Sequence, residues 1–208
     1  MGCVETAAIA HLLQPFIELD EMRLRAISTY IDLLLKWNSR INLTAIRDPS
    51  EIVQRHFGES LFAAKCALEQ KSVDTAIDLG SGAGFPGVPL AMLATEVQVT
   101  LIESQQKKAT FLKELVYALG LKNIKVFGDR AESYPAIADL VMLRAVERFE
   151  QALQMAIRLT RTGGRIALMI GSGQVEPARR LVSVVNWSDP VQMPCGHSRE
   201  LLIGTKAS

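Results

Sequence analysis

The chain has 208 residues, a formal net charge of +1 and 49% apolar residues. This length suits one α/β domain with a small extension and is too short for two full domains. No apolar run approaches the roughly 20 residues of a membrane helix. The start of the chain also lacks a signal-peptide pattern, so we expect a cytoplasmic protein. A net charge this small means that any nucleic-acid binding has to come from a local basic face.

The first 70 residues have the pattern of helices. Apolar residues between positions 21 and 37 recur close to helical spacing, which predicts a long amphipathic helix. Further along, Asp48 can cap a turn that begins at Pro49, a residue well suited to the first position of a helix. We therefore predict a helical N-terminal extension over residues 1–70.

From residue 71 onward, short apolar runs rich in branched residues alternate with helical stretches. The predicted strands are 73–79, 97–103, 123–128, 138–144 and 163–170, and the predicted helices are 89–95, 106–119 and 147–159. Strands that alternate with helices predict a mostly parallel, doubly wound sheet, and hence a Rossmann-like α/β fold over residues 71–208. The segments 181–193 and 200–206 have no convincing helix between them and predict late strands, which could form an antiparallel pair.

A glycine-rich loop follows the first predicted strand, in the sequence AIDLGSGAGFPGVPLAM at 76–92. The six residues from Gly82 to Gly87 fit G-x-G-x-x-G, the dinucleotide fingerprint. Two features oppose a pyrophosphate at this loop. Pro86 removes an amide at the start of the following helix, and the carboxylate of Asp78 would lie close to two phosphates. An NAD-type oxidoreductase is therefore the less favoured of two interpretations.

The same loop resembles the D/E-x-G-x-G-x-G loop of Rossmann-like, S-adenosylmethionine-dependent methyltransferases of class I. That cofactor has no phosphate and carries an ammonium and a sulfonium, which suit the carboxylate of Asp78. Gly80 and Gly82 would let the backbone approach the ligand. Glu103, at the end of the next predicted strand, is placed to accept hydrogen bonds from both ribose hydroxyls. The loop and Glu103 together favour a methyltransferase.

Two further segments border the same predicted crevice. The backbone of Ala131 and the side chain of Glu132 could contact the adenine edge, unless this segment is only a helix start capped by Asp129. Arg144 ends the fourth predicted strand, where a lone cation needs an anionic partner. That partner could be the cofactor carboxylate, an RNA phosphate, a guanine O6/N7 edge, or a structural salt bridge to Glu147 or Asp129.

The residues near Arg144 also bear on the target of methylation. Transfer to an exocyclic adenine amine usually goes with an Asn/Asp-Pro-Pro-aromatic motif, and Leu143-Arg144-Ala145-Val146 stands in its place. Transfer to pyrimidine C5 needs a cysteine nucleophile, and the Pro-Cys dipeptide at Cys195 lies so far downstream that we interpret it as a loop. No evident base is present, which is compatible with guanine N7 because that atom has no proton to lose. The three cysteines and three histidines have no metal-ligand spacing, so we expect no metal.

Several longer segments carry a closer resemblance. WNSRINLTAIRDPSEIVQRHFGES, DLGSGAGFPGVPLAM, LIESQQKKATFL, DRAE and LRAV occur in this order, and together they resemble the RsmG/GidB family of bacterial small-subunit rRNA guanine-N7 methyltransferases over roughly residues 20–205. The resemblance implies S-adenosylmethionine as cofactor, bound at Gly80, Phe85, Ala131, Glu132 and Arg144. It implies as substrate a guanine in the decoding-site loop of 16S rRNA, either free or within the small subunit or an assembly intermediate.

Basic side chains around the predicted crevice are candidates for RNA contact. Phe57 or Phe85 could stack on a splayed base; the alternatives are solvated charges and core aromatics. A methyltransferase of another RNA or of a small molecule, and an RNA-binding module without catalysis, stay open as other functions. The basic candidates are Arg40, Arg55, His56 and Arg199, with Arg47, Lys107, Lys108 and Arg148 as further members.

Overall fold

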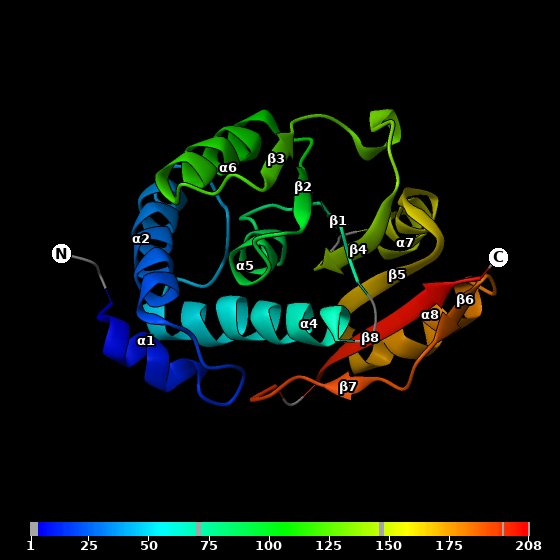
Figure 1. Cartoon of the computed structure of the whole chain (residues 1–208), viewed down its shortest axis with the longest axis horizontal. Helices are drawn as coiled ribbons and strands as arrows, with labels where there is room; N and C mark the ends of the chain where they lie inside the picture. The colour runs from blue at the N-terminus through cyan, green and yellow to red at the C-terminus, as the bar shows by residue number, and fades with distance from the viewer. Residues whose placement is uncertain (1–3, 70–71, 146–147, 197, 208) are drawn as a thin grey trace.

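The computed structural model describes residues 4–69, 72–145, 148–196 and 198–207. It contains an eight-stranded sheet in the order β3-β2-β1-β4-β5-β8-β6, with β7 paired to β8 (Figure 1). The strands from β1 to β5 pair in parallel, whereas β8 runs antiparallel to β5, β6 and β7. This topology confirms the predicted Rossmann-like sheet and its antiparallel late strands. The strands are β1 (Thr75–Leu79), β2 (Gln98–Ile102), β3 (Ile124–Phe127), β4 (Ala138–Arg144), β5 (Thr160–Gly171), β6 (Val185–Trp187), β7 (Val191–Gln192) and β8 (Arg199–Lys206).

The helices follow the predicted pattern closely. The carboxylate of Asp20 caps α2 by accepting a bond from the Arg23 amide, and Asp48 caps α3 in the same way. The predicted helix at 89–95 begins earlier, at Gly87, and the one at 147–159 is observed from Phe149. The helices are α1 (Thr6–Leu13), α2 (Glu21–Asn38), α3 (Pro49–Glu51), the π-helix η1 (Ile52–Gly58), α4 (Glu59–Leu68), α5 (Gly87–Leu93), α6 (Gln106–Ala118), η2 (Ala131–Ser133), α7 (Phe149–Leu159), η3 (Ser172–Gln174) and α8 (Val175–Leu181).

Alternating side chains of the strands divide the core into two layers. Ala76 and Met142 face a cluster that includes residues of α1, α2, η1, α4, α5 and α6. Ile77 and Leu143 face the opposite cluster, which α7 and α8 cover. In Figure 1, α1 and α2 lie at one end of the molecule, and β6 and α8 lie at the other. The N-terminal helices therefore share a core with the sheet.

The division into residues 1–70 and 71–208 stays a prediction, since the boundary itself lies outside the described residues. Within the parts of the chain that the structure describes, none of the helices has the length and apolar character needed to cross a membrane. Helix α8, which the sequence pattern did not indicate, covers the far end of the sheet beside β8 (Figure 1).

Candidate active site

The glycine loop after β1 is held against the end of β2. The amide of Gly82 donates to Oε2 of Glu103 at 2.9 Å, and the amides of Gly80 and Ser81 donate to the Ile102 carbonyl at 3.0 Å each. Gly80 and Gly82 have φ values of 75° and 55°, in the left-handed region that glycine adopts without a steric penalty. These bonds fix the loop at the carboxyl edge of the sheet, where ligands of doubly wound folds bind.

The start of α5, directly after this loop, offers no free amide to a ligand. Pro86 and Pro89 carry no N–H, the amide of Gly87 donates to Oδ2 of Asp78 at 2.9 Å, and the amide of Val88 bonds to a loop carbonyl at 2.9 Å. A helix N-terminus binds phosphate through its unpaired N–H groups. The start of α5 thus lacks the unpaired N–H groups on which pyrophosphate binding at a helix N-terminus depends.

Asp78 itself lies beneath the loop, on the sheet face that α5 covers. Asp78 is 1% exposed, and burial raises the pKa of its carboxyl to about 7. Oδ1 has no hydrogen-bond partner among the described residues. A Cβ at position 87 would lie 2.6 Å from the Asp78 Cβ, so Gly87 is required for this approach. Asp78 lines neither of the two cavities described next, and its predicted role toward the cofactor's positive charges stays a prediction.

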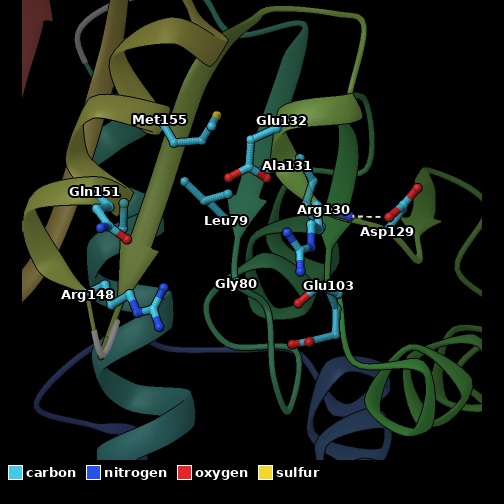
Figure 2. A pocket seen from close by; sticks show the side chains of 13 residues that line it. Leu79, Gly80, Glu103, Asp129, Arg130, Ala131, Glu132, Arg148, Gln151 and Met155 are labelled. Carbon is cyan, nitrogen blue, oxygen red and sulfur yellow. Dashed lines mark hydrogen bonds between the residues drawn. The ribbon is translucent and has the colours of Figure 1, made fainter.

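A first cavity of about 410 Å³ opens between the ends of β1, β2 and η2. Figure 2 shows Glu103 and Arg130 along one side of it and Gln151 and Met155 along the other. The rest of the lining is mixed: Leu79, Ile102 and Ala152 are apolar, whereas Asp129, Glu132 and Arg148 are charged. The cavity therefore offers apolar surface to a ring and several carboxylates, Glu103 among them, to hydrogen-bond donors. Its full lining is Leu79, Gly80, Ile102, Glu103, Ser104, Asp129, Arg130, Ala131, Glu132, Arg148, Gln151, Ala152 and Met155.

Glu103 is 6% exposed and rigidly oriented. Its Oε1 accepts a bond from the Gln105 amide at 2.7 Å, and its Oε2 accepts the bond from Gly82. Each oxygen of an ionised carboxylate has a second lone-pair direction. Glu103 can thus accept two further bonds from a ligand with adjacent hydroxyls.

The turn η2 completes this cavity. The carbonyls of Ala131 and Glu132 both accept from Nη2 of Arg158 at 2.8 Å, which fixes the turn from α7. Arg130, not Asp129, stands at the cap position of η2, and the Asp129 side chain bonds the amide of Arg130 at 2.7 Å. The alternative of a helix capped by Asp129 is therefore wrong. Ala131 and Glu132 line the cavity as predicted.

A second cavity of about 600 Å³ adjoins the first, because Gly80, Glu103, Ser104 and Arg148 line both. Phe85 forms part of its wall and stacks between two rings. Its centroid lies 5.0 Å from that of Tyr30 and 4.8 Å from that of His56. Its full lining is Leu43, Thr44, His56, Gly80, Ser81, Gly82, Ala83, Phe85, Glu103, Ser104, Gln105, Lys108, Arg144, Ala145 and Arg148.

His56 lines this cavity from η1, and its ring is held by a hydrogen bond with the side chain of Thr44. Its Nε2 lies 2.8 Å from Oγ1 of Thr44. Asn38 orders the loop that carries Thr44, since it accepts bonds from the amides of Leu43 and Thr44 and donates to the Thr44 carbonyl. Burial, together with the nearby guanidinium groups, of which Arg144 has the largest effect, lowers the pKa of His56 to about 3. His56 is therefore neutral at physiological pH.

Arg144, at the end of β4, has the anionic partner that its position required, but the partner is Glu59. Its Nη2 lies 3.0 Å from Oε2 of Glu59, and the two side chains are 8% and 5% exposed. The guanidinium also donates to the carbonyls of Arg55 and His56. Burial lowers the pKa of Arg144 to about 10, so it remains protonated.

The predicted salt bridge of Arg144 to Asp129 is wrong, because the Asp129 side chain bonds the Arg130 backbone instead. Glu147, the other predicted partner, lies outside the described residues. Arg144 also lines the second cavity. Its predicted contact with the cofactor stays a prediction.

The basic candidates for RNA contact fall into two groups. Those that line a cavity come from different elements around the carboxyl edge of the sheet: Arg55, His56, Lys108, Arg148 and Arg199. The others are exposed and line none of these cavities: Arg40, Arg47 and Lys107.

Two of the candidate side chains turn out to have other environments. Phe57 is 0% exposed and contacts the rings of Tyr30 and Phe85 edge-on, so the prediction that it stacks on a base is wrong. Phe85 is 6% exposed, and the rings of Tyr30 and His56 already stack on it, so the prediction that it stacks on a base is wrong as well, although it lines the second cavity. Cys195 is exposed in a turn after β7, which confirms its interpretation as a loop residue. In the described part of the chain, no group of three or more potential metal ligands is found.

The fold matches solved structures of low sequence identity. A putative O-methyltransferase from Klebsiella pneumoniae has a TM-score of 0.64 at 16% identity, with 97% of both chains covered. A SAM-dependent methyltransferase from Aquifex aeolicus has a TM-score of 0.59 at 18% identity, with 77% of this chain and 94% of that chain covered. The architecture is that of the Rossmann-like class I methyltransferases.

The sequence comparisons define the family within this class. The profile described as GidB, rRNA small subunit methyltransferase G, matches residues 23–200. The protein named ribosomal RNA small subunit methyltransferase G in Roseiflexus castenholzii is 38% identical over 206 residues, which cover 92% of this chain and 87% of that protein. The chain belongs to the GidB family.

Proposed function

We propose that this protein transfers a methyl group from S-adenosylmethionine to N7 of a guanine in the decoding-site loop of 16S rRNA. The family description and the name of the Roseiflexus relative support small-subunit rRNA as the substrate. The observation that carries the proposal is the pair of adjoining cavities at the carboxyl edge of the sheet. One of them suits a nucleoside and the other is open to a base, with Glu103 and Gly80 between them.

The residues of the first cavity fit an adenosyl group without phosphates. Glu103 would accept bonds from the ribose hydroxyls, and the apolar part of the wall, which includes Leu79, Ile102 and Met155, would pack against the adenine. Ala131 and Glu132, which line the same cavity, would contact the adenine edge. When bound, S-adenosylmethionine supplies an electrophilic methyl group on a sulfonium. A pyrophosphate-bearing dinucleotide has no comparable set of donors at the start of α5, so an oxidoreductase is disfavoured.

The residues of the second cavity would hold the target guanine. Phe85, which is stacked between Tyr30 and His56, contributes to the wall, and His56 is neutral because burial lowers its pKa to about 3. Guanine N7 has a free lone pair and no proton, so no side chain has to act as a base. Methylation leaves a positive charge on the guanine; the neutral His56 adds no further positive charge to a cavity that Lys108, Arg144 and Arg148 also line. The role of the protein is then alignment of the two reactants, which can supply most of the acceleration.

The RNA partner would approach across the basic rim. Arg40, Arg55 and Arg199 are the basic residues that we assign to RNA contact, and the neutral His56 would contact the target base within the second cavity. We also propose that the protein acts in the cytoplasm, on 16S rRNA that is free or part of a small-subunit particle.

Methyl transfer from labelled cofactor tests this function. Total RNA and small ribosomal subunits from a strain that lacks the protein are incubated with the enzyme, and the rRNA species are separated. We expect label in 16S rRNA and none in large-subunit rRNA, and Glu103→Ala should lose most of the incorporation at low cofactor concentration. Label in another RNA, or none in any RNA, would overturn the proposed substrate.

A further inference from the structure

A third cavity of about 370 Å³ adjoins the second one. Arg144 and Ala145 line both, whereas Arg55 and Arg199 line only the third. None of the described residues around it carries an acidic side chain. The cavity therefore presents three guanidinium groups directly beside the space that we assign to the target guanine.

The charges around this third cavity do not balance. Oε2 of Glu59 accepts from both Arg144, at 3.0 Å, and Arg199, at 3.1 Å, and this carboxylate is 5% exposed. Arg55 pairs with Glu51 on the outer surface of its helix at 2.7 Å. Two carboxylates thus face three guanidinium groups, and the side chains of Arg55 and Arg199 remain 47% and 28% exposed. An anion that entered the cavity would find donors that still have solvent-facing N–H groups.

The backbone between the two cavities is also unusual. Ala145 has a φ of 49°, a conformation that costs an alanine free energy and that persists where the surrounding structure enforces it, often at functional sites. Arg144, immediately before it, is anchored by Glu59 and by the carbonyls of Arg55 and His56. The partition between the two cavities is therefore a fixed part of the structure.

We propose that the third cavity binds a phosphate of the RNA backbone beside the target guanine, with Arg55 and Arg199 as its donors. This inference rests on the proposed function, because it takes the second cavity as the place of the guanine. Arginine is well suited to phosphate, since its planar fork can donate two parallel bonds. Holding one phosphate next to a splayed base positions the nucleotide without reading its sequence.

Arginine-to-glutamine variants with a matched control test this phosphate site. Arg55→Gln and Arg199→Gln should each weaken binding of unmodified 16S rRNA by about tenfold. Each should also lower the slope of log affinity against log salt by about 0.7 to 1, with cofactor affinity unchanged. Arg25→Gln is the control. It removes an equivalent i,i+4 ion pair to Glu21 on α2, far from the cavity, and should leave RNA binding unchanged.

Ethylation interference identifies the phosphate itself. RNA ethylated at random phosphates is incubated with the protein, and the bound RNA is recovered. In the RNA bound by wild type, and by the Arg25→Gln control, ethylation at a phosphate flanking the target guanine should be depleted. In the RNA bound by Arg199→Gln, ethylation at that phosphate should not be depleted. If both cavity variants keep the wild-type affinity, salt slope and interference pattern, the phosphate site is overturned although methylation persists. If wild type binds RNA in this way but methylates none of it, the proposed function fails and the phosphate contact stands.

Discussion

Replacement of Asp78 by asparagine tests whether the buried carboxyl beneath the glycine loop is protonated near neutral pH. Burial raises its pKa from the ordinary 3.8 to about 7. Between these values the folded protein holds a proton that the unfolded chain has released, so the wild type loses stability as pH rises through this window. A shift of about three units corresponds to about 4 kcal/mol.

Asp78→Asn removes this titration and keeps the side-chain oxygen that accepts the Gly87 amide. The new amide group would occupy the place of the unpaired Oδ1, at a cost of about 1–3 kcal/mol that does not depend on pH. We therefore expect the unfolding free energy of the variant, relative to wild type, to rise by about 4 kcal/mol between pH 4 and pH 8.

Urea denaturation followed by circular dichroism, repeated across this pH range, measures the difference between the two proteins. Asp139→Asn is a control of opposite kind. Burial raises the pKa of the Asp139 carboxyl, but the hydrogen bonds that it accepts from Thr75 and from the Asp74 amide outweigh this effect and lower the pKa. That variant should be less stable by a constant amount between pH 4 and 8. If Asp78→Asn also differs from wild type by a constant amount, the reasoning about burial is refuted.

Three further substitutions test the site. Glu103→Ala should weaken S-adenosylmethionine binding roughly tenfold to a hundredfold, because it removes charged acceptors for the ribose hydroxyls. Calorimetry measures the affinity, and tight binding of NADH by the wild type would contradict the cofactor assignment. Tyr30→Phe should lower the unfolding free energy by about 1–3 kcal/mol, because it leaves the Ala83 carbonyl without its bond from the hydroxyl; an unchanged denaturation midpoint would contradict this. Arg144→Ala should cost about 3 kcal/mol or more, because it removes one partner of the buried Glu59, and a loss below about 1 kcal/mol would argue against a tight pair.

Local patterns were sufficient for the elements that carry the first cavity. The apolar runs ending at Leu79 and Ile102 predicted β1 and β2, and the spacing of Glu103 from the loop placed it correctly at the cavity. Parallel strands bring their carboxyl ends to one edge, so these residues meet whatever the details of packing. Pro86 likewise predicted the loss of one amide at the start of α5, whereas the pairing of the Gly87 and Val88 amides is shown only by the structure.

Contacts across the chain were not accessible in this way. Arg144 and Glu59 are 85 residues apart, and nothing local in α4 indicates that its first acidic residue turns toward β4. Phe57 was misjudged although its spacing indicated the core: Val53, Phe57 and Leu61 are all buried and recur at the i,i+4 spacing of one helix face. Its neighbour His56 faces the second cavity from the adjacent side of η1.

The most direct test of the account is the identity of the methylated atom. Methylation at N7 places a positive charge on the guanine ring and makes the nucleotide a site of chain scission after borohydride reduction and aniline treatment. We expect 16S rRNA from a strain lacking the protein to break at one guanine in the decoding-site loop after incubation with enzyme and S-adenosylmethionine, and to stay intact there without enzyme. Incorporation of methyl groups into 16S rRNA without such a break would contradict the assignment to guanine N7.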